Sequence, residues 1–329
     1  MIVHLIDGTY ELFRQYYGLR RGRRRDDLAG RTSAARGPAP PGRGPAATQS
    51  AAGAPAAANP RGAAAPAADS GAATDSGAAV DLDAVRAVLR FVLRMLEGGA
   101  THLGVATDHV IESFRNDLWP GYKTSAGMER DILAQFEPLE EALVAMGVAV
   151  WAMVELEADD ALAAAARLAA ADPRVETVSI WTPDKDLAQC VRGDRVVQVD
   201  SRTGTIRDQT AVRRKFGVEP ALIPDYLALV GDAADGYPGI RGIGPKTAAG
   251  LLNRHGPIEA FPSDALGEQR GLALLFKDLA TLRADEQLFS DVDELEWRGP
   301  TAGLEAWAER IGDPGLEERC RALHRSAGR

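Results

Sequence analysis

Acidic residues recur in five short segments of this chain, each where an apolar stretch ends or a helical pattern begins. Any one such aspartate is ordinarily a helix N-cap or a turn residue. Few lysines or arginines lie between the segments, however, and ionised carboxylates brought together without partners repel one another. The nine acids are Asp7, Asp108, Glu157, Asp159, Asp160, Asp184, Asp186, Asp232 and Asp235.

A ligand set made of carboxylate oxygens favours hard divalent cations. The chain has only two cysteines, Cys190 and Cys320, which are far apart and belong to no Cys/His cluster. A zinc site and a disulfide framework are therefore not expected, and Mg²⁺ or Mn²⁺ suits the donors better. Two such ions about 4 Å apart would suit in-line attack of water on a phosphodiester.

The acids can act together only if the secondary structure brings them to one place. Apolar runs and helical periodicity alternate along the chain, which predicts a mostly parallel α/β sheet with helices on both faces. Several acids follow the strands directly, and open sheets of this kind bind ligands at the carboxyl ends of their strands. The expected strands cover residues 2–6, 102–107, 148–154, 177–182 and 196–199, and the expected helices 85–96, 133–146 and 158–171.

Charge is distributed unevenly over the 329 residues, whose net charge is −9. Residues 20–80 are rich in Ala, Gly, Pro and Arg and carry nine arginines and four aspartates, so the remainder carries about −14. The stretch has almost no large apolar side chain, which predicts a disordered insertion, and its arginines are read as solvated rather than as a phosphate site. A strongly acidic remainder binds phosphate poorly unless metal ions neutralise it.

A glycine-punctuated turn follows the last acids. Gly239, Gly242 and Gly244 would let the backbone approach a phosphate, and a helix expected to begin near Pro245 would direct its N–H groups at an anion. Lys246 adds a positive charge. The turn predicts salt-sensitive binding of duplex DNA without reading of the bases.

In combination, these motifs resemble those of the flap endonucleases and the 5′→3′ exonuclease domain of bacterial DNA polymerase I. The resemblance covers about residues 1–19 and 82–262 and implies a PIN-like 5′-nuclease fold followed by a helix–three-turn–helix DNA-binding subdomain. We expect a nuclease domain at 1–19 and 81–218, the insertion at 20–80, the subdomain at 219–262 and a helical segment at 263–329. The matching motifs are Asp7-Gly8-Thr9, Ser113-Phe114-Arg115, Tyr122-Lys123, Glu157-Ala158-Asp159-Asp160, Thr182-Pro183-Asp184-Lys185-Asp186 and Gly231-Asp232 through Ala248.

The resemblance also implies roles for individual residues. A first metal cluster corresponds to Asp7, Asp108, Glu157, Asp159 and Asp160, and a second to Asp184, Asp186, Asp232 and Asp235. Basic residues near the scissile phosphate, where they would stabilise developing charge, correspond to Arg14, Arg115 and Lys123. DNA contacts correspond to Tyr122, Gly239, Gly242, Gly244, Lys246 and Thr247.

The family pattern further implies two divalent ions, a monovalent K⁺ on backbone carbonyls of the glycine turn, and DNA with a 5′ flap or 5′ end as substrate. We expect a monomer, and because no polymerase sequence follows, any partner polymerase would be a separate chain. Two departures stand out: Ala126 replaces an arginine that the family often has after the lysine, and Gly236-Tyr237 replaces the usual Asn-Ile or Asn-Leu.

Two other functions remain open on the sequence: a related PIN-like ribonuclease, and a non-catalytic protein that binds DNA junctions. The first would not need the glycine turn, and the second would have little reason to keep all nine acids. No apolar run is long enough for a signal peptide or a membrane helix, so we expect a cytoplasmic protein without membrane contact.

Overall fold

The computed structural model describes residues 1–34 and 81–327. Contacts divide the chain into two units, Met1–Arg20 with Val80–Arg329, and Arg21–Ala79. Helix α1 (Gly8–Ala34) begins in the first unit and continues into the second. The sheet, the hydrophobic core and all of the predicted site residues belong to the first unit.

One mixed sheet organises the first unit, with strand order β3-β2-β1-β4-β5-β6. Strands β1 to β5 run parallel and β6 pairs antiparallel with β5, so the predicted mostly parallel sheet is confirmed. Because β1 lies between β2 and β4, the carboxyl ends of these three strands meet at one edge. The strands are β1 (Ile2–Asp7), β2 (His102–Asp108), β3 (Ala149–Met153), β4 (Thr177–Trp181), β5 (Val196–Val199) and β6 (Ile206–Arg207).

Helices connect the strands and extend the chain beyond the sheet. The further α-helices are α2 (Asp83–Glu97), α3 (Phe114–Leu118), α4 (Arg130–Leu133), α5 (Phe136–Ala145), α6 (Ala158–Ala171), α7 (Gln209–Phe216), α8 (Ile223–Val230), α9 (Pro245–His255), α10 (Arg270–Ala280), α11 (Leu304–Arg310) and α12 (Gly315–Ala327). Short 3₁₀ helices are η1 (Asp186–Cys190), η2 (Pro220–Leu222), η3 (Ile258–Ala260), η4 (Gly267–Gln269) and η5 (Val292–Leu295).

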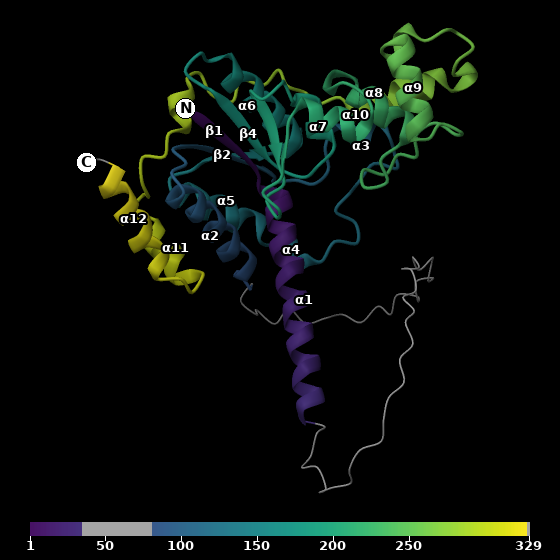
Figure 1. The fold of residues 1–329 in the computed structure, drawn as a ribbon. Coiled ribbons are helices and arrows are strands. Elements are labelled where there is room, and N and C mark those ends of the chain that lie inside the picture. Colours follow the sequence, from purple (N-terminus) through teal and green to yellow (C-terminus); the bar gives the residue numbers. More distant parts are fainter. Residues whose placement is uncertain (35–80, 328–329) are drawn as a thin grey trace, which may run out of the picture. The chain divides into compact units, whose positions relative to one another are not determined.

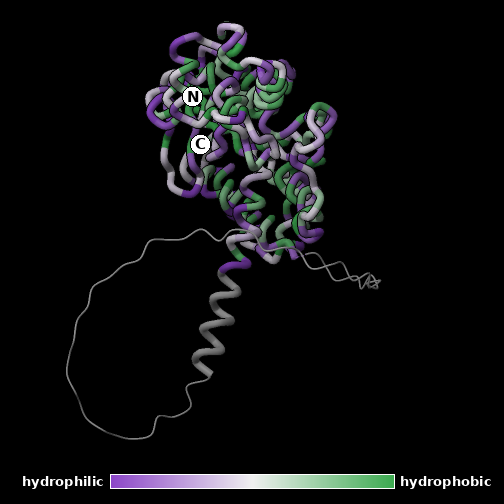
Figure 2. Tube along the Cα trace, turned by 90° about the vertical axis from the view of Figure 1, so that its right-hand side faces the viewer, coloured by the Kyte–Doolittle hydropathy of each residue, from purple (hydrophilic) through white to green (hydrophobic). Residues whose placement is uncertain are grey.

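Alternation along β1 explains why both faces of the sheet are covered. Val3 and Leu5 belong to one buried cluster, which includes the alanine-rich face of α6. Ile6 belongs to another, formed mainly with α2 and α5. Figure 1 shows α6 on one side of the sheet and α2 with α5 on the other. In Figure 2 the hydrophobic segments run through the body of this unit, and hydrophilic segments are frequent along its loops.

A third buried cluster lies outside the sheet. It joins α7, α8, α9 and α10 and also contains Tyr122 and Tyr237. Helices α11 and α12 instead pack on α5 and α2, and Figure 1 shows them at the other end of this unit from α8–α10. None of the described helices is long and apolar enough to cross a membrane.

The disorder predicted from composition for residues 20–80 is wrong over the first part of that stretch. Residues 20–34 were expected to be disordered, but helix α1 continues through them to Ala34. The arginines and alanines of this stretch favour helix, and adding residues to a helix that has already begun costs far less than starting one. The remainder of that predicted disorder, residues 35–80, lies outside the described residues.

Candidate active site

Asp7 and Asp108 end the neighbouring strands β1 and β2, and both carboxylates are held by hydrogen bonds. Oδ1 of Asp7 accepts the Tyr10 N–H at 2.8 Å, and Oδ2 accepts the Thr182 hydroxyl at 2.9 Å. Oδ1 of Asp108 accepts the Ala158 N–H at 2.7 Å, at the start of α6. These bonds tie the ends of β1, β2 and β4 to the beginning of α6, which positions the acids around that edge.

Two acidic triads share one residue. Asp159, Asp184 and Asp186 form the first triad, and Asp186, Asp232 and Asp235 form the second. Within each triad the possible ligand atoms lie within 4.8 Å of one another. They come from the start of α6, the loop after β4 and the loop after α8, so segments far apart in sequence form one site with two candidate cation positions.

The buried carboxylate of Asp186 is destabilising unless a cation binds it. Its carboxylate is buried, and among the described residues Oδ1 has no hydrogen-bond partner. A buried acceptor without a partner is destabilising, more so when it is charged. A hard divalent cation held by carboxylates would relieve this cost, so the donor set fits Mg²⁺ or Mn²⁺.

The pKa values of several acids are raised in the absence of such a cation. Burial and then the neighbouring Asp108 and Asp184 charges raise the pKa of Asp7 to about 7, against hydrogen bonds that lower it. Burial also raises the pKa of Asp235 to about 6. The pKa of Asp186 lies well above its ordinary value, because of burial and then of Asp184 and Asp235. Carboxylates that resist ionising together are typical of a site completed by positive charge.

Lys123 supplies part of that charge. Its Nζ lies 2.8 Å from an oxygen of Glu157 and 3.5 Å from one of Asp235, and its side chain is 26% exposed. Burial favours the neutral amine, but these carboxylates outweigh it and raise the pKa of Lys123 well above its ordinary value. Burial would likewise raise the pKa of Glu157, yet Lys123 and Arg115 hold it below its usual range. Lys123 therefore lies beside both the Glu157 side of the site and the second triad.

Arg115 and Asp160, predicted for the phosphate and for metal, pair with each other in the interior. Arg115 is 1% exposed and donates to both oxygens of Asp160 at 2.7 Å. It also donates to the Leu279 carbonyl at 2.8 Å. Asp160 is fully buried and accepts the backbone N–H groups of Glu157 and Arg283 as well. The pair therefore links α3, α6 and α10 through internal hydrogen bonds.

Tyr122 and Arg14, predicted to contact the substrate, also have internal partners. Tyr122 is 5% exposed, and its hydroxyl donates to Glu157 at 3.3 Å. Arg14 pairs with the buried Glu11, and its guanidinium lies 5.9 Å from the centre of the Phe91 ring. Among the contacts described for this part of the chain, Arg14 reaches none of the nine acids.

Three residues that support the acids were not singled out from the sequence. Lys185 pairs with Asp232 at 2.6 Å, and Ser113 donates to Glu157 at 2.6 Å. Thr182 donates to Asp7 as described above. All three lie within the motifs that resemble the family, so they could have been found in the sequence as polar residues of the segments that carry the acids.

The glycine turn before α9 has one closed and one open part. A Cβ on Gly239 would lie 2.3 Å from the backbone nitrogen of Gly231, so this glycine is required by close internal packing. Gly242 and Gly244 face open space. Lys246 and Thr247 are exposed in the first turn of α9, whose N-cap Gly244 offers no side-chain acceptor. This open part retains the features needed for an anion site.

Family comparisons agree with this geometry. A model described as 5′-3′ exonuclease, N-terminal resolvase-like domain, matches residues 65–217. One described as 5′-3′ exonuclease, C-terminal SAM fold, matches residues 218–303. Flap endonuclease Xni of Edwardsiella ictaluri is 36% identical over 204 residues, covering 58% of this chain and 79% of that protein. The chain belongs to the 5′-3′ exonuclease family.

In other relatives, the segment that aligns with this chain is only part of a longer protein. The 5′-3′ exonuclease of Aquifex aeolicus is 34% identical over 179 residues, which span 54% of this chain and 61% of that protein. DNA polymerase I of Pseudomonas aeruginosa is 36% identical over 233 residues, spanning 64% of this chain but only 25% of the polymerase.

Solved structures share the fold. The bacteriophage T5 D15 protein co-crystallised with metal ions aligns with a TM-score of 0.53 at 15% identity, covering 73% of this chain and 89% of that one. A complex of the T5 D15 flap endonuclease with DNA and metal ions aligns with a TM-score of 0.51 at 16% identity, covering 74% and 91%. At this identity the likeness establishes the fold alone.

Proposed function

We propose that this protein is a divalent-metal-dependent 5′→3′ exonuclease or flap endonuclease that hydrolyses DNA phosphodiester bonds without sequence preference. The observation that carries the proposal is the pair of acidic triads joined through Asp186, whose buried Oδ1 has no partner among the described residues. The names of the curated relatives, 5′-3′ exonuclease and flap endonuclease, support the same activity.

The two triads would hold two Mg²⁺ or Mn²⁺ ions, with Asp186 facing both positions. When bound, such ions polarise a phosphodiester and lower the pKa of a nucleophilic water. Asp7 and Asp108 lie at the adjoining strand ends. Their hydrogen bonds to Thr182 and Ala158 fix their orientation, so they would bind metal directly or through water.

Lys123 is the basic residue placed to act on the substrate. Its ammonium lies beside Glu157 and Asp235 and remains partly exposed. Once divalent ions neutralise the acids, the ammonium can leave them and contact a non-bridging phosphate oxygen. A preorganised cation at that oxygen stabilises the charge that builds in the transition state. The sequence predicted this contact with the phosphate for Arg14, Arg115 and Lys123 together, and we propose it for Lys123.

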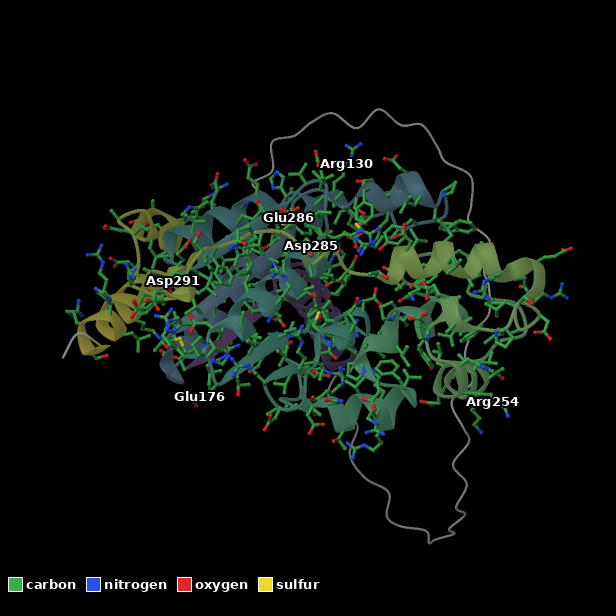
Figure 3. The ribbon with its side chains drawn as sticks, turned by 90° about the horizontal axis from the view of Figure 1, so that it is seen from above. Arg130, Glu176, Arg254, Asp285, Glu286 and Asp291 are labelled. Carbon is green, nitrogen blue, oxygen red and sulfur yellow. The ribbon has the colours of Figure 1, made fainter. Side chains whose placement is uncertain are left out.

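DNA would be held away from the cut by the first turn of α9. The open backbone at Gly242 and Gly244, the N–H groups of the helix and the exposed Lys246 suit phosphates and read no base. Arg254 lies at the other end of α9 and points away from the body of the unit (Figure 3). Binding of this kind is independent of sequence and weakens with salt.

Basic side chains also flank the site near β6 and α7. The Arg207 guanidinium donates to the Pro183 carbonyl at 3.3 Å, next to Asp184. Lys215 is exposed. Partial burial and the nearby charges of Arg207 and Lys185 lower its pKa, and they outweigh Asp184 and Asp200, which raise it. Cations that repel one another beside an acidic site are stabilised by a polyanion, which supports DNA as the substrate.

The proposal has three further parts. The carbonyl groups of the glycine turn would hold a K⁺ ion, so replacing K⁺ with Li⁺ should weaken duplex binding. The protein would act as a monomer, which light scattering tests directly. A DNA polymerase on a separate chain would use the product, and pull-down with the cell's polymerase tests that partnership.

A 5′-labelled flap duplex and a matched single-stranded RNA, each incubated with Mg²⁺, Mn²⁺ or EDTA, test the proposal. Metal-dependent cutting near the flap junction is expected, and the product ladder distinguishes exonuclease from endonuclease action. Cutting of RNA alone would instead support the PIN-like ribonuclease. Tight junction binding without turnover in either metal would support the non-catalytic binding protein.

A further inference from the structure

An open cavity of about 310 Å³ is lined by residues of helix α2 and of strands β1 and β4. Its wall is mainly apolar, and the polar groups set into it belong to His4 and Arg94. Among the described residues that line the cavity, none is one of the nine acids. Small-molecule sites in proteins have this size and composition, with a few polar groups in an apolar wall.

Two aromatic rings give the cavity a surface for stacking. Trp181, the last residue of β4, packs edge-on against buried Phe91, with ring centroids 6.0 Å apart and planes at 70°. This contact fixes the orientation of the indole. Trp181 is itself only partly buried, so part of its ring remains open to a ligand in the cavity. Nucleobases of every kind stack on aromatic side chains presented in this way.

His4 adds a hydrogen-bond donor to the same cavity. The indole Nε1–H of Trp181 can only donate, and it lies 3.0 Å from Nδ1 of His4. Nδ1 is therefore the acceptor, and the neutral imidazole carries its proton on Nε2. Burial lowers the pKa of His4, which keeps the ring neutral. Within the described part of the chain the Nε2–H has no partner, so it is available to an acceptor on a ligand.

Arg94 supplies a positive charge. Its side chain is exposed, and its guanidinium forms no ion pair or hydrogen bond with the residues that the structure describes. Arg90, one turn earlier on α2, is instead bonded to Asp313 at 2.7 Å. A guanidinium with all of its donors free suits a phosphate. The cavity thus offers a stacking surface, a donor and a cation, which complement the base, the ring acceptors and the phosphate of a nucleotide.

We propose that this cavity binds one nucleoside monophosphate, with the base against Trp181 and the phosphate at Arg94. The choice of ligand rests on the proposed function, because exonuclease cutting of DNA releases nucleotides of this class. The volume of about 310 Å³ equals that of about ten water molecules, which suits a single nucleotide and not a DNA strand. The site is distinct from the acidic triads, so the protein binds a product of its reaction away from the place where it is formed.

Titration calorimetry with deoxyadenosine 5′-monophosphate in EDTA tests the proposal without cleavage, because the metal-free acidic site repels phosphate. The wild-type chain should bind this nucleotide more tightly than deoxyribose 5-phosphate, which lacks the base. Arg94→Met should weaken nucleotide binding about tenfold, the effect of losing one charge-assisted hydrogen bond. Arg90→Met is the matched control. It removes the same charge from the same helix outside the cavity, so it should bind the nucleotide as the wild type does.

Tryptophan fluorescence locates the bound base. The nucleotide should quench the emission of the wild-type chain but not that of Trp181→Phe, and Lys246→Ala, which alters the first turn of α9, should bind it normally. Equal nucleotide affinity in Arg94→Met and the wild type, loss of binding in Lys246→Ala, or quenching that persists in Trp181→Phe would each overturn the proposal. Failure of the wild-type chain to bind the nucleotide would also overturn it and leave the proposed function standing, since metal-dependent cutting of the flap duplex tests that function separately.

Discussion

Replacing Arg115 with methionine should destabilise the fold by about 3–5 kcal/mol, the range for breaking a buried ion pair from one side. The Arg115 and Asp160 side chains are 1% and 0% exposed, so water cannot take over the lost contacts. Two bonds to Asp160 and one to each of the Leu279 and Thr281 carbonyls disappear together. Asp160 keeps the backbone donors of Glu157 and Arg283, which places the expected loss toward the lower end.

Urea unfolding followed by circular dichroism in EDTA measures this loss without involving the metal site. Arg174→Met is a matched control. Arg174 also bonds several carboxylates, those of Asp172, Asp291 and Asp293, but it does so at the surface, so its replacement should change stability little. If Arg115→Met unfolds at the wild-type urea concentration and yet loses cleavage, Arg115 acts on the substrate and its structural assignment is wrong.

Three other outcomes are expected. Lys123→Met should reduce the cleavage rate about 10²–10³-fold at saturating metal, as removal of one preorganised donor does; an unchanged single-turnover rate would remove Lys123 from the chemistry. Mn²⁺ binding should release more protons at pH 6 than at pH 8, because Asp7 and Asp235, with pKa values of about 7 and 6, hold protons in the metal-free protein only at the lower pH. Calorimetry in buffers of different ionisation enthalpy counts these protons, and a release that does not fall with pH contradicts the assignment. Lys246→Ala should lower the slope of log affinity against log salt by about 1, whatever the DNA sequence. Lys277→Ala, which removes a lysine paired with Asp225 and Glu259, should leave that slope unchanged.

The strand-end acids could be predicted from sequence because their positions follow from local patterns. An apolar run that ends at Asp7 or Asp108 indicates both a strand and the edge at which it stops, and parallel strands bring such ends together. The helix over Ala158–Ala171 followed in the same way from its run of small apolar residues.

The roles of basic and aromatic residues could not be predicted, because burial decides them and burial depends on distant segments. Arg115 stands in a motif that suits a phosphate contact, but the carbonyl groups of Leu279 and Thr281 and the carboxylate of Asp160 enclose it. Tyr122 is turned inward in the same way. Gly239 and Gly242 are alike in sequence, and only the fold shows that one packs on Gly231 while the other faces open space.

The central claim is that two triads sharing Asp186 bind the ions that drive DNA cleavage. Asp186→Asn tests it most directly, with the exposed Asp194→Asn as control. We expect Asp186→Asn to fold, to bind a labelled flap duplex in EDTA as the wild type does, and to lose both Mn²⁺ binding and cleavage, while Asp194→Asn keeps all of these properties. Wild-type cleavage by Asp186→Asn in Mg²⁺ would contradict the account.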